Sequence, residues 1–238
     1  VAEQGGNLFL VARSEVKLHQ LQQELLNNFP IKCHYYPTDL TDLDKWSVVI
    51  KTIIDEAGTI DAMINNAGVG IFNYVEETTW QDTLNMFQLN VFALMKAINY
   101  CLPEMTEQGH GHIINIASQA GKIATPKSAV YGATKHAVIG FSNALRLEVE
   151  NKGVYVTTVN LGPVKTNFFN VADPFGNYQQ SVEKYMLDPN DVAEKIVKVL
   201  FTNKREINMP KWMDVGSRFY QVFPSLIERL LKSQFNKK

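Results

Sequence analysis

The stretch His112-Ile113-Ile114-Asn115-Ile116-Ala117-Ser118 decides the fold of this chain. It is apolar at almost every position rather than at every second one, which is typical of a β-strand buried on both faces. Such strands belong to parallel sheets that are covered by helices on both sides. Ser118 ends the run, so we expect it at the carboxyl edge of the strand, where open α/β sheets bind ligands.

Other short aliphatic runs alternate with longer helical patterns. The predicted strands are Asn7–Val11, Lys32–Tyr36, Ile60–Ile64, His112–Ile116, Val154–Val159 and Glu206–Met209. The predicted helices are Glu15–Asn28, Leu43–Ala57, Thr79–Met105, Lys127–Asn151 and Asp191–Leu200. This alternation favours an α/β fold with a doubly wound parallel sheet in three αβα layers. Residues 1–203 are the predicted catalytic domain, and residues 204–238 add its last strand and a tail packed on the same domain.

The chain begins in the middle of this pattern. Residues 1–6, Val-Ala-Glu-Gln-Gly-Gly, are typical of the last turn of a helix that stops at glycine. A doubly wound sheet starts instead with a strand, a glycine-rich turn and a helix, and the amides of the turn bind the cofactor pyrophosphate. We therefore expect roughly 25–30 residues upstream that carry this strand and turn. A stably folded protein with an intact mass of 26.9 kDa would contradict that expectation.

The composition describes an ordinary globular protein and excludes several functions. Of 238 residues, 45% are hydrophobic and 20% are charged, with a net charge of −1. Cys33 and Cys101 lack metal or redox spacing, so we expect reduced thiols and a cytoplasmic protein. His110 and His112 stand where a buried strand starts, so a turn is the expected structure and no metal site is predicted. No run of eighteen apolar residues is present, and nothing supports nucleic-acid binding.

The clearest chemistry comes from Ser118, Tyr131 and Lys135. Tyr131 and Lys135 stand four residues apart on the helix predicted after Pro126, so both project from one face. Reduction of a ketone by hydride requires a proton for the developing alkoxide. Lowering the tyrosine pKa from about 10 by three units costs roughly 4 kcal/mol, and a neighbouring ammonium can supply this stabilisation. A serine hydroxyl can hold the substrate oxygen. Taken singly, each residue has an ordinary interpretation, as a solvated helix pair or a turn residue.

Four motifs stand in one order along the chain. They are Asn65-Asn66-Ala67-Gly68 after a strand, Leu89-Asn90-Val91 in a helix, Ser118 at a strand end, and Tyr131-Gly132-Ala133-Thr134-Lys135 thirteen residues later. This order resembles the short-chain dehydrogenase/reductase family, from Leu8 to about Leu200. The resemblance implies a Rossmann-type fold and the catalytic residues Asn90, Ser118, Tyr131 and Lys135. In it, Tyr131 donates and accepts the proton, and Asn90 holds a water that relays protons through the lysine. On its own, Asn90 is equally well interpreted as a polar residue that kinks a helix.

The resemblance also implies a cofactor site. Its residues are Arg13, Ser14, Asp39, Leu40, Asn66, Ala67, Gly68, Tyr131, Lys135, Gly162, Val164 and Thr166. In this site Asp39 meets the adenine edge, while Val164 and Thr166 bind the nicotinamide carboxamide. Two departures stand out: the family's first glycine motif is absent, and Gly162-Pro163 reverses the family's usual order of proline then glycine, which shifts the rigid peptide.

The strand that ends near Val11 indicates which nicotinamide cofactor is used. An acidic side chain there bonds the ribose 2′-hydroxyl of NAD, whereas an arginine accommodates the 2′-phosphate of NADP. This chain has Ala12 at the acidic position, followed by Arg13 and Ser14. Arg13 alone is also compatible with an ordinary surface charge, but the absence of an acid at position 12 favours NADP(H) independently. We predict NADP(H) as the cofactor, and Ala12→Asp is expected to shift preference towards NAD(H).

Aromatic residues mark the predicted substrate lid, residues 167–190. They include Phe168, Phe169, Phe175, Tyr178 and Tyr185, with Ile71 and Phe72 as further candidates. We expect Ser118, Gln119, Phe168 and Phe169 to contact the substrate. An aromatic lid implies a largely apolar pocket, so the predicted substrate is a small apolar ketone, aldehyde or alcohol. Lys165 is near enough to leave a second alternative open, in which the substrate carries a carboxylate or phosphate group.

The C-terminal tail differs in charge from the rest of the chain. Eight Lys or Arg and three Asp or Glu lie between Lys204 and Lys238, a net charge of +5. The pattern that begins at Ser225 is a capping box, and the expected helix has one apolar stripe. The stripe consists of Leu226, Ile227, Leu230, Leu231 and Phe235. We expect it to pack on its own domain or on a partner subunit, and contact with an anionic membrane surface stays open as the alternative. The family resemblance implies a homodimer or homotetramer built through the long helices.

Two other functions compete with an NADP(H)-dependent carbonyl reductase or alcohol dehydrogenase. One is a catalytically silent NADP-binding sensor or assembly subunit, and the other is a truncated, non-functional product. The presence of Ser118, Tyr131, Lys135 and Asn90 together argues against a sensor, because a sensor needs no proton relay. Tyr131→Phe distinguishes them: an enzyme loses turnover and still binds cofactor, whereas a sensor loses nothing.

Overall fold

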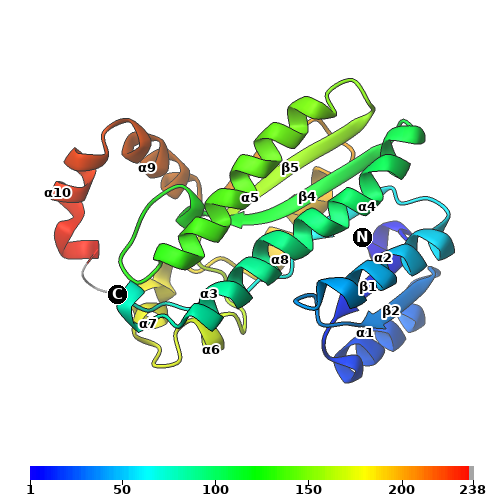
Figure 1. Cartoon of the computed structure of the whole chain (residues 1–238), viewed down its shortest axis with the longest axis horizontal. Coiled ribbons are helices and arrows are strands. Elements are labelled where there is room, and N and C mark those ends of the chain that lie inside the picture. The colour runs from blue at the N-terminus through cyan, green and yellow to red at the C-terminus, as the bar shows by residue number, and fades with distance from the viewer. Residues whose placement is uncertain (236–238) are drawn as a thin grey trace.

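A computed structural model describes residues 1–235 and shows strands alternating with helices (Figure 1). The strands are β1 (Leu8–Ala12), β2 (Cys33–Pro37), β3 (Ala62–Asn65), β4 (Gly111–Ser118), β5 (Val154–Leu161) and β6 (Glu206–Met209). The helices are α1 (Glu15–Asn28), α2 (Leu43–Ala57), α3 (Trp80–Phe87), α4 (Ala93–Glu107), α5 (Ala129–Glu148), α6 (Phe169–Ala172), α7 (Asn177–Val182), α8 (Pro189–Lys198), α9 (Lys211–Val222) and α10 (Pro224–Phe235). Five short turns of helix are η1 (Ala2–Gln4), η2 (Val75–Glu77), η3 (Gln88–Phe92), η4 (Gln119–Gly121) and η5 (Glu183–Tyr185).

All strand pairs of the described residues are parallel, as predicted. β1 pairs with β2, and the other four strands form a second sheet in the order β3-β4-β5-β6. The predicted sheet is therefore divided between β1 and β3. The long central pair sets the register, with Ile113 opposite Val156 and Ser118 opposite Leu161. The carboxyl ends of β4 and β5 thus lie side by side.

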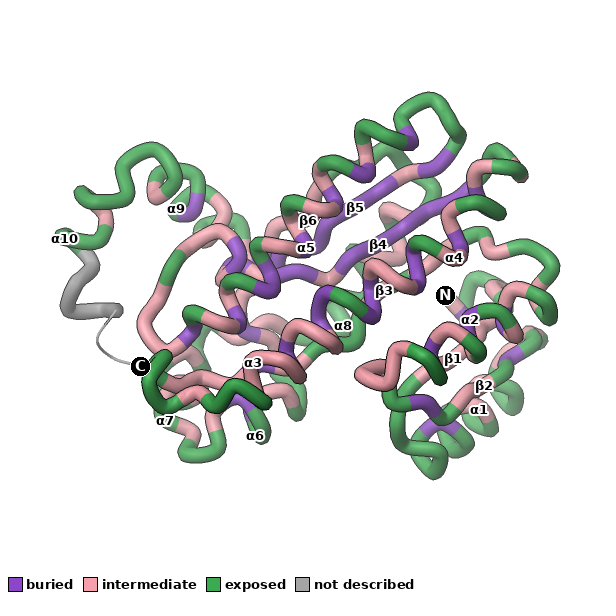
Figure 2. Tube along the Cα trace, viewed as in Figure 1, coloured by how far each residue is buried: buried purple, intermediate pink, exposed green. Residues whose placement is uncertain are grey.

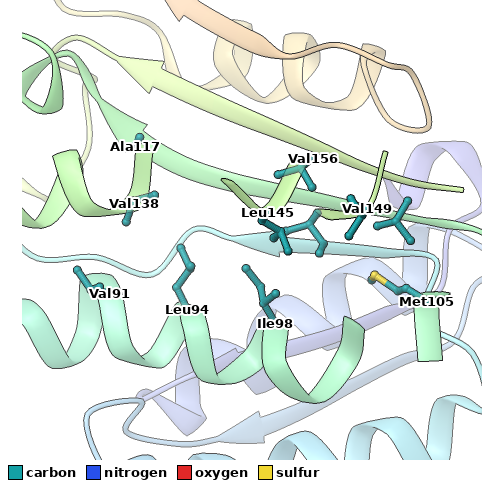
Figure 3. Packing of buried hydrophobic residues seen from close by; sticks show 11 residues of the cluster. Val91, Leu94, Ile98, Met105, Ala117, Val138, Leu145, Val149 and Val156 are labelled. Atoms are coloured by element: carbon teal, nitrogen blue, oxygen red, sulfur yellow. The ribbon is translucent and has the colours of Figure 1, made fainter. Parts of the chain in front are cut away.

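Helices cover both faces of the four-stranded sheet. On one face, α4 and α5 pack on β4 and β5 through a cluster that includes Leu94, Ile98, Val138 and Leu145 (Figure 3). On the other face, Val192 of α8 packs against buried side chains of β4, β5 and β6. The two central strands are buried along most of their length (Figure 2), which is the burial that the apolar run predicts.

The pair β1–β2 is joined to the larger sheet through helices. Trp46 and Ile50 of α2 are buried against Ala93, Ala97 and Cys101 of α4. The Trp46 indole also donates a hydrogen bond of 3.0 Å to the Ala93 carbonyl. The contact between α2 and α4 therefore joins the short sheet to the larger one, and Val11 of β1 and Met63 of β3 pack against the same buried cluster.

Local signals explain where the helices begin. The side chains of Ser14, Asp42, Thr79 and Asp188 accept backbone N–H groups at the starts of α1, α2, α3 and α8. Pro189 occupies the first turn of α8, where it is well tolerated. At the beginning of the chain η1 ends at Gly5, whose φ of 78° is the left-handed conformation expected of a helix stop.

One helix prediction needs correction. The segment Thr79–Met105 was expected to be continuous, but it is divided into α3, the π-helical turn η3 and α4. The break contains Asn90, in agreement with its interpretation as a kinking residue, and π-turns inside helices are frequent at functional sites.

The C-terminal segment forms α9 and α10, and α9 packs on β6 and η4. The side chains of Leu231 and Phe235, and all of Lys237 and Lys238, lie outside the described residues. Within the part of the chain that the structure describes, no helix is both long enough and apolar enough to cross a bilayer.

Candidate active site

Ser118 is fixed at the carboxyl edge of β4 by two hydrogen bonds. Its hydroxyl donates to the Leu161 carbonyl over 3.2 Å and accepts from the Ala120 amide over 3.1 Å. The second bond caps the turn η4, which carries the chain away from the sheet. The hydroxyl therefore has a defined position between the ends of β4 and β5.

Tyr131 and Lys135 lie in the first two turns of α5, on the face that covers this edge. Both are buried, with 8% and 5% of their surface exposed. The Lys135 Nζ atom donates a hydrogen bond of 2.8 Å to the Ile116 carbonyl of β4 and lies 5.9 Å from the centre of the Tyr131 ring. Tyr131 makes a side-chain hydrogen bond with Ser118. The structure thus brings together the three side chains that were predicted to carry the chemistry.

The protonation of this cluster differs from the expectation for the tyrosine. Burial raises the pKa of Tyr131 to about 12, with a smaller rise from Tyr178, and the hydrogen bond with Ser118 opposes the change. Burial also lowers the pKa of Lys135 to about 8. The expected lowering of the tyrosine pKa is therefore wrong for this structure, because loss of water around the ring outweighs the favourable interactions. Tyr131 holds its proton at neutral pH.

Asn90 ties the loop after β3 to the base of α5. Its amide nitrogen donates to the Val69 carbonyl over 2.8 Å and to the Thr134 hydroxyl over 3.0 Å, while its oxygen accepts from the Val69 amide over 2.8 Å. Thr134 in turn donates to the Tyr131 carbonyl. The side chain of Asn90 is therefore a positioning element, and the π-turn η3 is what directs it inward.

Two glycines let this loop approach the catalytic side chains. A Cβ atom on Gly68 would lie 3.3 Å from the Asn90 side-chain oxygen and 3.4 Å from the Lys135 Nζ atom. A Cβ atom on Gly70 would lie 2.7 Å from the ring of Phe168 and 3.2 Å from that of Tyr131. Contacts under 3.0 Å require movement, so a side chain at Gly70 would displace the tip of the Phe168 ring.

An aromatic wall stands over Tyr131. The ring of Phe72 lies 5.7 Å from that of Tyr131 and 5.3 Å from that of Tyr178, both edge to face. Phe168 lies 5.7 Å from Tyr131, and Phe169 packs behind it against Tyr178. Beside this wall is a cavity of about 280 Å³ whose lining includes Ile71, Phe72, Val171, Phe175 and Tyr178, together with the charged residues Glu77, Lys127 and Asp173.

The predicted adenosine end of the site lies at the end of β1. Ala12 is exposed, Arg13 follows it, and Ser14 caps α1. Across the short sheet, the carboxylate of Asp39 accepts the Thr41 amide and hydroxyl, which lower its pKa, and the charge of Arg13 adds to this lowering. Arg13 and Asp39 are therefore close enough to interact, and Leu40 packs against the α2–α4 contact.

The other predicted cofactor positions have varied surroundings. Asn66, Ala67 and Gly68 are exposed at the end of β3. Val164 forms a parallel bridge with Leu187, and Thr166 is exposed. Gly162 instead packs closely, because a Cβ atom there would lie 2.8 Å from the sulfur of Met213 and 2.9 Å from Pro210. Its surroundings give it a packing role.

The residues present fit the two ends of a nicotinamide dinucleotide. Among the described residues, the buried Lys135 ammonium has one hydrogen-bond acceptor for its three N–H groups, so it can still donate to ribose hydroxyls. Gly68 leaves the space above this ammonium free. Residues 1–235 contain no glycine-rich turn for the pyrophosphate.

None of the four predicted substrate residues lines the cavity, and two residues of the site were missed. Phe168 and Phe169 pack against Phe72 of the lining, and Ser118 lies at the end of β4. Gln119 is buried and donates to the Asn160 carbonyl of β5, so it belongs to the wall behind Ser118 and not to the cavity lining. Gly70 and Thr134 were not predicted. A polar Thr134 in an otherwise small and apolar turn of helix was the available signal for one, but no sequence pattern marked Gly70. Within the described residues, no three His, Cys, Asp or Glu side chains gather as a metal site.

The fold and the site together define a class of protein. Parallel strands covered by helices, with polar side chains gathered at their carboxyl ends, describe the Rossmann-like α/β enzymes. The chain belongs to the short-chain dehydrogenase family, because a model of that family, described as short chain dehydrogenase, matches residues 1–174. It is thus an oxidoreductase of the class that acts on CH–OH groups.

Individual relatives agree with this assignment. The chain is 31% identical over 209 residues to an uncharacterized oxidoreductase of Staphylococcus epidermidis, a match that covers 88% of this chain and 86% of that one. It is also 31% identical over 213 residues to a dehydrogenase/reductase SDR family member 7B of Xenopus laevis, with 85% of this chain and 66% of the frog protein covered.

Solved structures show the same fold. A serine dehydrogenase complexed with NADP+ is 29% identical, with a TM-score of 0.77, and the match covers 87% of this chain and 86% of that one. A short-chain dehydrogenase of Streptomyces avermitilis has a TM-score of 0.81 at 24% identity, covering 97% of this chain and 88% of that one, so it bears on the fold alone.

Proposed function

We propose that this protein is an NADP(H)-dependent oxidoreductase that transfers hydride between nicotinamide and an apolar ketone, aldehyde or alcohol. Tyr131 is its general acid and base. The observation that carries the proposal is the convergence of Tyr131, Ser118 and Lys135 at the carboxyl edge of the sheet, beneath an aromatic wall. The cofactor, when bound, would supply the hydride, and residues of the chain itself bind the substrate oxygen and transfer the proton.

Tyr131 suits the delivery of a proton to an alkoxide. With a pKa of about 12 it is protonated across the neutral range, so the reductive direction starts with the acid form in place. An alkoxide that develops next to the Tyr131 hydroxyl is more basic than the phenolate, so the transfer runs downhill. In the oxidative direction Tyr131 must first lose its proton, which the raised pKa disfavours.

Ser118 and Lys135 position the reacting groups. The Ser118 hydroxyl is held between Leu161 and Ala120, and exchange of its bond to the Leu161 carbonyl lets it donate to a substrate oxygen. Lys135 keeps an ammonium near the Tyr131 ring, where it stabilises negative charge that develops on the phenol oxygen. Asn90 holds the Val69 segment in place beside Gly68. The family resemblance alone supports a water at Asn90 that relays protons.

NADP(H) preference rests on the end of β1. Arg13 offers a guanidinium to a 2′-phosphate, and Ala12 presents no carboxylate that would repel it. The serine dehydrogenase of similar fold was solved as a complex with NADP+, which agrees with this choice.

The aromatic wall favours a substrate with an apolar body. Phe72 and Phe168 pack against the Tyr131 ring, and Phe72 and Tyr178 line the cavity beside them. Rings of this kind bind apolar groups and exclude water from the reacting atoms. We also propose a homodimer or homotetramer built through α4 and α5, and a cytoplasmic location.

A paired fluorescence titration with NADPH and NADH on protein of known intact mass tests the cofactor assignment. The wild type is expected to bind NADPH more tightly, and Ala12→Asp is expected to shift the ratio of affinities towards NADH, because a carboxylate repels the 2′-phosphate. A ratio that is unchanged in Ala12→Asp refutes the role of this position. Binding of neither dinucleotide refutes the proposed function for this chain.

A further inference from the structure

Helix α9 is amphipathic with its apolar side turned to solvent. Trp212, Val215, Phe219 and Val222 are spaced by three or four residues, so they form one stripe along the helix. Each is between 54% and 66% exposed. Most helices of globular proteins turn such a stripe towards the core, so this orientation requires an explanation.

The inward side of α9 carries polar side chains beside Met213. Ser217 is fully buried and lies about half a turn around the helix axis from the stripe. Asp214 lies 3.7 Å from the Lys122 Nζ atom, which also pairs with Glu206 of β6 at 2.7 Å. The side chain of Lys122 is 10% exposed. These ion pairs fix the rotation of α9, so the stripe cannot turn inward without breaking them.

Exposed apolar side chains also follow α9 in the sequence. Phe223 joins the two helices, and Leu226 and Leu230 follow at helical spacing, each 54–67% exposed. The two helices lie at the periphery of the molecule, and the tube in Figure 2 shows that most of this segment is exposed. Of the five residues predicted to form an apolar stripe in the tail, Leu226 and Leu230 are thus on the solvent side.

Cations flank the stripe. On the helical wheel of α9, Lys211 and Arg218 lie side by side along one edge of it, and both are exposed. Arg218 pairs with Asp214 at 3.0 Å, whereas Lys211 has no carboxylate partner among the described residues. The acid Asp214 is turned towards Lys122, away from the stripe. An apolar face bordered by basic side chains, with a tryptophan at one end, is the pattern of a helix that lies in a membrane interface.

We propose that the face formed by Trp212, Val215, Phe219, Val222, Phe223, Leu226 and Leu230 docks on the surface of an anionic lipid bilayer. The apolar side chains enter the boundary between headgroups and acyl chains, and Lys211 and Arg218 contact the anionic headgroups. A bilayer accepts a projecting stripe without a matching groove, which a second copy of the chain would have to provide. The stripe begins beside the predicted lid, since the Trp212 ring lies 5.6 Å from that of Tyr185.

Sedimentation with vesicles of phosphatidylcholine, with and without phosphatidylglycerol, tests the proposal. The wild type is expected to sediment with the anionic vesicles. The double variant Phe219→Ser/Val222→Ser is expected to bind them at least about ten-fold more weakly, because two buried apolar groups are lost. Lys211→Gln is expected to lower binding roughly five-fold on anionic vesicles and to leave neutral ones unaffected.

Val48→Ser is the matched control. Val48 lies on α2 and is 65% exposed, close to the 66% of Val222, so its replacement is expected to leave vesicle binding unchanged. Circular dichroism melts show whether each variant is folded. The proposal is overturned if the wild type ignores anionic vesicles. It is equally overturned if light scattering shows an oligomer that the double variant dissociates while vesicle binding stays the same, since the face would then bind a second copy.

Discussion

Replacing Lys135 with methionine is expected to stabilise the protein while it abolishes turnover. The lysine is buried, and its pKa falls from 10.5 to about 8. Each pKa unit corresponds to about 1.4 kcal/mol, so holding the charged form costs roughly 3 kcal/mol at pH 7. Methionine has a similar shape and carries no charge. The methionine side chain cannot donate the hydrogen bond that Lys135 makes to the Ile116 carbonyl, and this loss reduces the gain in stability by about 1 kcal/mol. The expected net gain is roughly 2 kcal/mol, or a rise in Tm of about 4–8 °C.

The pH dependence of this gain identifies its cause. The pKa of the lysine is lower in the folded state, so below about pH 8 both states are protonated and the full cost is present. As the pH rises from 8 towards 10.5, the folded protein loses this proton first and the cost fades. Urea unfolding of both proteins is therefore expected to show a gain of about 2 kcal/mol for Lys135→Met at pH 7 that shrinks to about zero at pH 10, where the remaining charge cost of about 1 kcal/mol equals the lost hydrogen bond.

A surface lysine supplies the control for Lys135→Met. Lys45 has a side chain 79% exposed and pairs with Asp42 at the start of α2, and such pairs contribute little. Lys45→Met is expected to show no comparable gain at either pH. A Lys135→Met protein that is less stable than the wild type at pH 7, or one whose gain is the same at pH 7 and pH 10, refutes the reasoning.

Two further predictions concern packing. Gly70→Ala is expected to lower kcat/KM at least about ten-fold with little change in NADPH affinity, because the new methyl group displaces Phe168 or Tyr131. Gly140→Ala is the control, because the space around Gly140 is open. Equal kinetics of the two variants would contradict this prediction. Burial lowers the pKa of His112 to about 4, so in the unfolded chain this residue takes up a proton first as the pH falls. Between pH 6.5 and pH 4 the wild type should therefore lose about 3 kcal/mol more stability than His112→Asn in urea melts; parallel profiles would contradict this.

The sequence predicted the parts of the structure that depend on local pattern. Apolar runs located the strands to within about two residues, because burial on both faces leaves no polar alternation. The i, i+4 spacing of Tyr131 and Lys135 placed both on one face of α5, and Ser118 lay at the predicted edge. These features require only strand and helix periodicity, which a single sequence carries.

Features that depend on tertiary contacts were not predictable. Asn90 was interpreted as a residue that kinks the helix, but the π-helical turn η3 is tied to bonds between Asn90 and Val69, which are distant in the sequence. The raised pKa of Tyr131 depends on how much water the aromatic wall excludes. An amphipathic pattern in α9 shows that two faces differ, but only the ion pair of Lys122 with Asp214 decides which face is inside.

Turnover by Tyr131→Phe, measured beside NADPH binding, tests the central claim most directly. With acetophenone and a medium-chain aldehyde as probes, the wild type is expected to consume NADPH, and the variant to lose about 10²–10⁴-fold in rate. Its NADPH affinity should stay close to that of the wild type, because the phenol oxygen is the only atom removed. A variant that turns over as fast as the wild type, or a wild type that binds NADPH and reduces neither probe, would contradict the account and favour a catalytically silent NADP-binding protein.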